Sequence, residues 1–166
     1  NAALVVTVRT EDFGAPDALA GVRLQRRVEE AAFAAGGGDY RAPAANLLAF
    51  LGRGSGPVEA SCRPGVREAD LAEVLPDFVT ESLRRALPQF DRKLRGFVTR
   101  EAVLVGVESR TSAPLRILRG EDGQSLPHPG LYPVGEGAGY AGGIVSSAVD
   151  GLKVARRLAG RDDDAL

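Results

Sequence analysis

The sequence predicts an α/β fold, in the form of an α+β fragment, from three observations. An apolar segment of strand character, Ala2–Val8, opens the chain. Long stretches with apolar residues at helical spacing follow, and short strand-like runs return after Phe97. A glycine-rich loop then leads directly into a final amphipathic helix. Strands and helices are therefore expected to share one mixed architecture.

Composition and charge exclude several classes of protein. The 166 residues are 44% hydrophobic and 26% charged, as in an ordinary globular domain. With 21 Lys+Arg against 22 Asp+Glu, the net charge of −1 provides no basic field for a phosphate backbone, so we expect no nucleic-acid partner. The apolar runs fall far short of the roughly 20 residues that cross a bilayer, and no signal pattern is present. We expect a cytoplasmic protein without membrane contact.

Single copies of cysteine and histidine argue against a disulfide or a metal site. Cys62 has no second thiol to pair with, and His128 is the sole imidazole. Prolines flank His128 and Gly130 follows, so we expect an exposed loop histidine. The chain contains no methionine and opens on Asn1 directly before the strand-like segment. This opening predicts that the chain was cut from something longer.

The first half of the chain is expected to be largely helical. Apolar residues repeat at helical spacing through Asp17–Ala35, and Gly36–Gly38 stops that helix. Pro43 can open a short helix over Ala44–Leu51, which ends in the flexible loop Gly52–Pro57.

A second helical region spans Arg67–Leu94. Pro76 and Pro88 are expected to divide it into two or three short helices, because proline fits the first turn of a helix but not its middle. The basic residues between its apolar positions predict a solvated surface, with a basic ligand-binding face as the alternative. The expected buried positions are Leu71, Val74, Leu75, Phe78, Val79, Leu83, Leu87, Phe90 and Leu94.

Strand patterns return in the last third of the chain. We expect strands at Ala102–Val107, Leu115–Leu118 and Gly130–Gly135, with Arg119–Pro129 as a polar turn. A final amphipathic helix is expected over Ala141–Ala159. Its buried side is expected to carry Ile144, Val145, Ala148, Val149, Leu152, Ala155 and Leu158.

The loop before that helix is the most informative segment. It contains Gly137-x-Gly139-x-x-Gly142, which matches the dinucleotide-binding fingerprint as a string. A fingerprint that opens a Rossmann unit needs a second parallel strand after the helix and an acid about 20 residues further on. No strand follows the helix in this chain, so that interpretation fails.

The start of the helix can still face a ligand. Its first turn carries no carboxylate, and no strong capping residue precedes it, so its backbone N–H groups and positive dipole end are available. Glu136, at the end of the expected strand, could accept hydrogen bonds from sugar hydroxyls. Alternatively, the glycines only permit tight packing between strand and helix, and Glu136 is a solvated loop acid.

Two blocks, Gly106–Ile117 and Gly130–Gly151, resemble the C-terminal signature of a family of bacterial FAD-dependent proteins. These proteins are usually described as uncharacterised FAD-dependent dehydrogenases, or NAD(P)/FAD-dependent oxidoreductases. Asn1–Gly14 and Gly36–Pro43 also resemble the family, so the resemblance covers nearly the whole chain. The family's N-terminal fingerprint for the ADP half of FAD has no counterpart here.

The resemblance implies a fold and a split flavin site. Residues 106–166 would be the C-terminal return of a two-dinucleotide-fold FAD domain, and residues 1–105 part of an inserted substrate-side domain with its helical region at 67–94. Many two-dinucleotide-fold flavoproteins use Asp where this chain has Glu136. The cofactor-binding positions implied are Gly135, Glu136, Gly142, Gly143 and Ile144.

The same resemblance implies a role and a partner for the chain. It would complete the flavin side of an FAD site, with NAD(P)H as a candidate electron donor and a small molecule as substrate. Arg110 and Thr111 would lie toward the flavin or the substrate. The missing N-terminal region of the same polypeptide would be the partner, and the isolated chain would be inactive.

Catalytic residues and the function class stay open at this point. Tyr140, Glu108 and His128 are candidates for acid or base only by residue type. A non-catalytic interaction or scaffold domain is the alternative function, and a nucleotide-binding module that holds a phosphate in the glycine loop is a third.

Overall fold

The computed structural model describes residues 2–161, which fall into two compact units. The first unit contains the described residues up to Phe13 together with Leu24–Ser109. The second contains Gly14–Arg23 and the described residues from Arg110 onward. A short 3-10 helix, η1 (Thr10–Phe13), precedes helix α1 (Ala20–Ala35).

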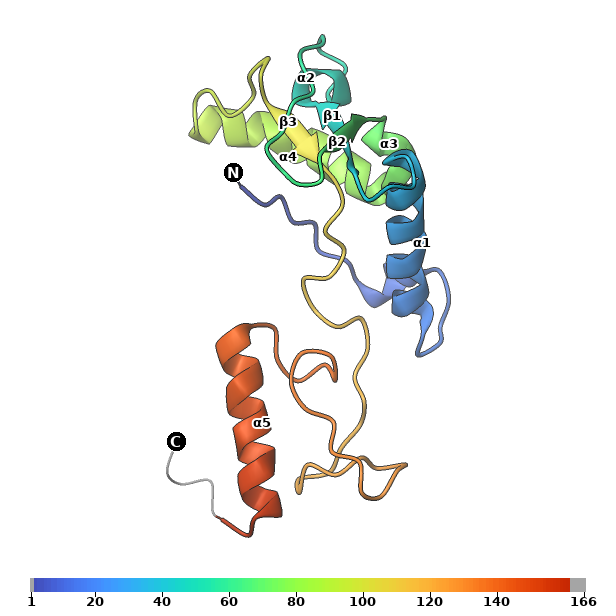
Figure 1. Cartoon of the computed structure of the whole chain (residues 1–166), viewed down its shortest axis with the longest axis vertical. Coiled ribbons are helices and arrows are strands. Elements are labelled where there is room, and N and C mark those ends of the chain that lie inside the picture. Colours follow the sequence, from blue (N-terminus) through green and yellow to red (C-terminus); the bar gives the residue numbers. More distant parts are fainter. Residues whose placement is uncertain (1, 162–166) are drawn as a thin grey trace. The chain divides into compact units, whose positions relative to one another are not determined.

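A small mixed sheet forms the centre of the first unit. Strand β1 (Ala42–Asn46) lies between β2 (Val66–Glu68) and β3 (Val103–Val105) (Figure 1). It pairs in parallel with β2 and antiparallel with β3, and Ala44 has a partner residue on both sides. Because β1 is the central strand, its side chains are buried from Pro43 onward.

Three helices cover this sheet and build the core. They are α2 (Leu47–Phe50), α3 (Leu71–Val74) and α4 (Asp77–Lys93). One hydrophobic cluster joins β1 with all three helices, and Leu87 of α4 is completely buried within it. The buried members are Ala45, Leu47, Phe50, Leu71 and Leu87.

Asn46 fixes the junction between β1 and α2. Its side-chain oxygen caps α2 by accepting from the N–H of Leu48 at 3.0 Å. Its amide nitrogen donates to the carbonyls of Arg100 at 2.7 Å and Pro57 at 3.2 Å. A buried amide with both ends satisfied stabilises the fold, whereas an unpaired one would destabilise it. Asn46 therefore holds two loops against the sheet.

The helix predicted at residues 17–35 is confirmed, with its start at Ala20. The glycines that follow it adopt positive φ at Gly37 and Gly38, as expected of a helix end. The helix predicted at Ala44–Leu51 is wrong in its first half, because those residues belong to β1. Pairing on both sides of β1 overrides the local helix pattern.

The predicted break at Pro88 is also wrong. Pro76 does mark a helix start, as the N-cap of α4, but Pro88 lies inside that helix. Proline in a helix interior costs about 3 kcal/mol because one backbone hydrogen bond is lost. Leu83 and Leu87, on the preceding turn, pack into the hydrophobic cluster and offset that cost.

Of the four predicted strands, one forms. Val103–Val105 of the predicted Ala102–Val107 is β3. Ala2–Val8 belongs to no strand, and neither Leu115–Leu118 nor Gly130–Gly135 forms one among the described residues. A strand requires continuous pairing with a neighbour, and the described part of the second unit shows isolated backbone hydrogen bonds and an isolated bridge between Arg119 and Ser125 in place of a ladder.

The final helix is confirmed as α5 (Ile144–Leu158), but its expected buried side is wrong. Ile144 is 92% exposed and Val145 is 75% exposed, whereas Val154 is the buried residue of the helix. Gly123 lies so close to Val154 that a Cβ there would sit 3.0 Å from its Cγ1. The helix therefore rests on the loop around Gly123 and leaves most of its apolar side chains uncovered.

Candidate functional site

The glycine-rich loop begins with a tight turn in front of α5. The N–H of Gly139 donates to the carbonyl of Glu136 at 2.9 Å, and the N–H of Tyr140 donates to that of Gly135 at 3.1 Å. Gly135 and Gly139 have φ values of +71° and +82°, which other residues rarely adopt. The local backbone therefore requires glycine at these two positions.

Gly139 is further required by packing. A Cβ at this position would lie 2.4 Å from the carbonyl oxygen of Leu115 and 2.9 Å from the Cα of Arg116. The loop is held in this place by the N–H of Ile117, which donates to the carbonyl of Ala138 at 3.1 Å. Close packing alone accounts for this glycine.

Gly142 and Gly143 differ from Gly139 in both respects. A Cβ at Gly142 would meet nothing within 4 Å, and one at Gly143 would meet only the Oγ of Ser146, at an ordinary 3.7 Å. Gly143 has a φ of −168°, which is extended backbone that any residue adopts. Neither packing nor conformation within residues 2–161 requires glycine here.

The start of α5 is exposed and lacks a side-chain cap. Gly143 is its N-cap residue, and no acid occupies the first turn. The Gly143 carbonyl accepts from the N–H of Ser147 at 2.9 Å and the hydroxyl of Ser146 at 3.0 Å. Within the described residues, no acceptor pairs with the N–H groups of Gly142, Gly143 or Ile144. These donors and the positive end of the helix dipole face solvent.

An ion pair that the sequence did not reveal anchors α5 to the loop. Arg119 donates through Nη1 and Nη2 to the two carboxylate oxygens of Asp150, at 3.0 Å and 2.6 Å. Asp150 also accepts from the N–H of Gly135 at 2.8 Å, and Arg119 donates to the carbonyl of Pro133 at 2.7 Å. The two charged side chains are only 12% and 15% exposed. The pair therefore connects the helix to the strand-like segment before the glycine loop.

Tyr140 completes this cluster. The Arg119 guanidinium lies 3.6 Å from the centre of the Tyr140 ring. The Tyr140 hydroxyl accepts a hydrogen bond from the backbone N–H of Arg119 at 3.2 Å. Arg116 lies 5.0 Å from the same ring centre and donates to the carbonyl of Gly139 at 3.0 Å. Cation–π contacts and hydrogen bonds thus fix the loop on both sides of Tyr140.

The ion pair also sets the charge state of its members. The hydrogen bond from Arg119 is the main reason that the pKa of Asp150 lies below its ordinary value. The hydrogen bond to Asp150 likewise raises the pKa of Arg119. Both groups are therefore charged over the whole physiological pH range, which suits an anchor better than a proton-transfer role.

The predicted site residues lie in different surroundings. Gly135 is buried, and both its N–H and its carbonyl are hydrogen bonded within the unit. Glu136 is half-buried, and its carboxylate has no hydrogen-bonding or ion-pair partner within residues 2–161. Arg110 and Thr111 are both exposed. The structure thus gathers Gly135 and Glu136 in one turn, ahead of the helix start.

The candidate acid–base residues differ in their surroundings. His128 is exposed in its loop, as the prolines around it predict, and Glu108 is exposed in the first unit. The Tyr140 hydroxyl accepts a hydrogen bond from the backbone N–H of Arg119.

Two further classes of site are absent from the described part of the chain. No group of three His, Cys, Asp or Glu side chains there could hold a metal ion. Of the helices in residues 2–161, none has both the length and the apolar character that crossing a membrane requires.

Comparison with known proteins decides the family. A family model described as "FAD-dependent protein, C-terminal domain-like" matches residues 1–111. The chain belongs to this family. An uncharacterised protein of Clostridium beijerinckii (strain ATCC 51743 / NCIMB 8052) is 45% identical over 162 residues. That similarity covers 95% of the chain but only 30% of the relative, so the chain spans less than a third of that relative's length.

The residues at the start of α5 fit one side of the FAD that the family description names. Gly142 and Gly143 leave room for atoms close to the backbone, and unpaired N–H groups at a helix start favour an anionic or electron-rich group. They fit only one side, because the described residues contain no loop that could enclose the ADP phosphates.

Arg119 and Asp150 are the members of this site that sequence reasoning missed. They are separated by 31 positions, and no spacing rule relates a loop arginine to an acid in the middle of a later helix. One indication was present in the sequence. Asp150 follows the apolar Val149 in a helix whose other charges cluster at its C-terminus, and such an acid often has a fixed partner.

Proposed function

We propose that this member of the FAD-dependent protein family is the C-terminal part of an oxidoreductase, and that the start of α5 lies against the flavin. The observation that carries the proposal is the pair Gly142 and Gly143, for which the described residues supply no requirement. Glycine is well accepted at an N-cap, which accounts for Gly143 in part but not for Gly142. Close approach of a ligand to the backbone supplies a reason for both.

The chain's own residues would position and orient the cofactor. Bound FAD would supply hydride or electron transfer, and the protein groups would hold it. The N–H groups of Gly142, Gly143 and Ile144 would donate to flavin or phosphate oxygens, and the Glu136 carboxylate would accept from ribityl hydroxyls. Gly135 would contribute through the shape of its turn, since its polar backbone groups are already bonded. Arg119 and Asp150 would act as positioning residues.

The division of labour along the chain is part of the same proposal. Residues 1–105 would belong to an inserted substrate-side domain and residues 106–166 to the FAD domain, with Arg110 and Thr111 toward the flavin or substrate. The exposed Ile144, Val145 and Leu152 support this assignment, because an apolar helix face is normally covered by further polypeptide. The family description names FAD and gives no support to NAD(P)H as the electron donor.

A scaffold function is the second candidate, and Gly139 favours it. Its glycine is fully explained by packing against Leu115 and Arg116, so at least one position of the fingerprint-like string serves the fold. The two candidates differ in what they expect at Gly143.

Replacement of Gly143 in the full-length polypeptide separates them. Gly143→Val would place a branched side chain where flavin atoms belong, so FAD occupancy should fall at least about tenfold while the apo protein keeps its thermal midpoint. Gly151→Val is the matched control, since a Cβ at Gly151 meets nothing within 4 Å and lies two turns further along α5. Flavin absorbance per protein and apo thermal midpoints are measured for all three proteins.

The outcomes are distinct. Lost flavin in Gly143→Val with normal flavin in Gly151→Val supports the flavin-facing role. Unchanged flavin in Gly143→Val, or an equal loss in both variants, contradicts it.

A further inference from the structure

The opening segment Ala2–Val8 forms no helix, turn or strand and has no backbone partner within residues 2–161. Within residues 2–161, none of its N–H or carbonyl groups makes a backbone hydrogen bond, and it belongs to no strand of the sheet. Its sequence, Ala-Ala-Leu-Val-Val-Thr-Val, is rich in β-branched residues, which favour strands. It therefore has the composition of a strand without the neighbour that a strand requires.

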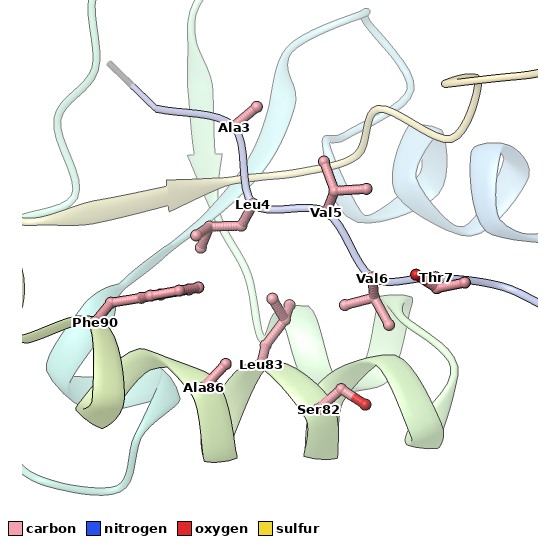
Figure 2. Close-up of a pocket in the computed structure, with 9 residues that line it drawn as sticks. All are labelled: Ala3, Leu4, Val5, Val6, Thr7, Ser82, Leu83, Ala86 and Phe90. Atoms are coloured by element: carbon pink, nitrogen blue, oxygen red, sulfur yellow. The ribbon is translucent and has the colours of Figure 1, made fainter. Parts of the chain in front are cut away.

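One side of this segment is already packed. Leu4 and Val6 point toward α4, where Leu83 and Phe90 face them across a groove of about 280 Å³ (Figure 2). Leu4 also packs on the hydrophobic cluster of the first unit. Leu4 and Val6 are thus partly buried, whereas Val5 between them is exposed, which is the alternation expected of a strand with one side on the core.

The other side is uncovered. Val5 points away from α4 in Figure 2 and is 67% exposed. An exposed edge with unpaired backbone groups is a template for a further strand. Addition of a strand beside this segment would satisfy those backbone groups.

We infer that Ala2–Val8 is a strand-addition site for a β-strand from the part of the same polypeptide that lies outside these residues. The added strand would come from the same polypeptide, because the chain spans only 30% of its Clostridium beijerinckii relative and most of such a protein lies outside these residues. A covalently connected strand is also present at high effective concentration. This inference is independent of where the flavin binds.

Hydrogen–deuterium exchange at single-residue resolution tests the inference in the full-length polypeptide. Amides of residues 3–8 should exchange at least about tenfold more slowly than in an unstructured reference, in an alternating pattern if one edge is paired. The protection should not change with protein concentration. Exchange at the unstructured rate throughout the segment overturns the inference, and protection that appears only as the protein dimerises overturns it in favour of a second copy.

Two proline variants separate pairing from mere burial. Val5→Pro and Val8→Pro remove N–H groups from opposite edges of a strand, and both valine side chains are exposed. At least one of them should abolish the protection. Ala60→Pro, in an exposed loop without a strand partner, is the matched control and should leave it unchanged. Protection that survives both Val5→Pro and Val8→Pro overturns the inference.

Discussion

At the scale of single residues, the second unit depends on one charged cluster. Arg119 binds Asp150 through two hydrogen bonds, and both side chains are largely buried. When one partner of such a pair is removed, the other is left as an uncompensated charge, which is why breaking the pair costs more than the pair contributes. The cluster thus fixes the loop in front of α5 more firmly than an exposed ion pair could.

Asp150→Asn should therefore destabilise the chain by about 2 kcal/mol, because the Arg119 guanidinium loses its counter-charge while the side-chain shape is kept. Urea unfolding followed by circular dichroism measures the change. Asp39→Asn is the control, since its ion pair with Arg41 is about half exposed and should contribute little. Equal effects at both positions would contradict the anchoring role of Asp150.

The effect of Asp150→Asn should also depend on pH. The folded-state pKa of Asp150 is below its ordinary value of 3.8, so its contribution to stability is complete above that value and is lost as pH falls through the lower folded pKa. The stability difference between wild type and variant should be constant near neutral pH and shrink in acid. A difference that grows in acid would mean that another group carries the effect.

The two glycines of the loop that flank Ala138 make a matched pair for a packing test. Gly139→Ala should destabilise by about 2 kcal/mol or more, because it combines a positive φ of +82° with a Cβ that would contact the Leu115 carbonyl at 2.4 Å. Gly137→Ala should change stability by less than about 0.5 kcal/mol, since its Cβ would meet nothing within 4 Å. Thermal melts of both variants check this. A larger loss at Gly137 would refute the close packing assigned to Gly139.

At the scale of elements, local sequence patterns predicted the long helices and failed where tertiary pairing decides. Helical spacing and the stop at Gly36–Gly38 located α1, and the amphipathic pattern located α5. The helix expected after Pro43 was wrong because β1 gains neighbours on both sides, which no local pattern reveals. The buried side of α5 was wrong because Val154, rather than Ile144 or Val145, meets the loop around Gly123.

Pro88 offers a test of how α4 is held together. The helix continues through Pro88, although proline has no backbone N–H and one helical hydrogen bond is therefore missing at this position. Pro88→Ala should therefore stabilise the chain, by about 1–3 kcal/mol, because it restores that bond and removes the ring from the preceding turn. Chemical denaturation provides the measurement. A loss of more than about 1 kcal/mol would indicate that the half-buried ring contributes packing that outweighs the missing bond.

At the scale of the whole molecule, the sequence identified the family and the region of interest but not the contacts that shape it. The blocks around Gly106–Ile117 and Gly130–Gly151 predicted the FAD-dependent family, which the comparison confirmed for the chain. The segments Leu115–Leu118 and Gly130–Gly135, where strands were expected, make isolated backbone hydrogen bonds but no ladder among the described residues. Local sequence could not reveal this, because a strand depends on continuous pairing with a neighbour that is distant in sequence.

Under the proposed function the flavin site is split, with the start of α5 supplying one side and the rest of the polypeptide supplying the ADP half. Equilibrium dialysis against FAD, with flavin absorbance per protein as the readout, tests it directly on the isolated 166-residue chain and on the full-length polypeptide. The full-length polypeptide should retain about one FAD per chain and the isolated chain essentially none. Stoichiometric FAD on the isolated chain, or none on the full-length polypeptide, would contradict the claim.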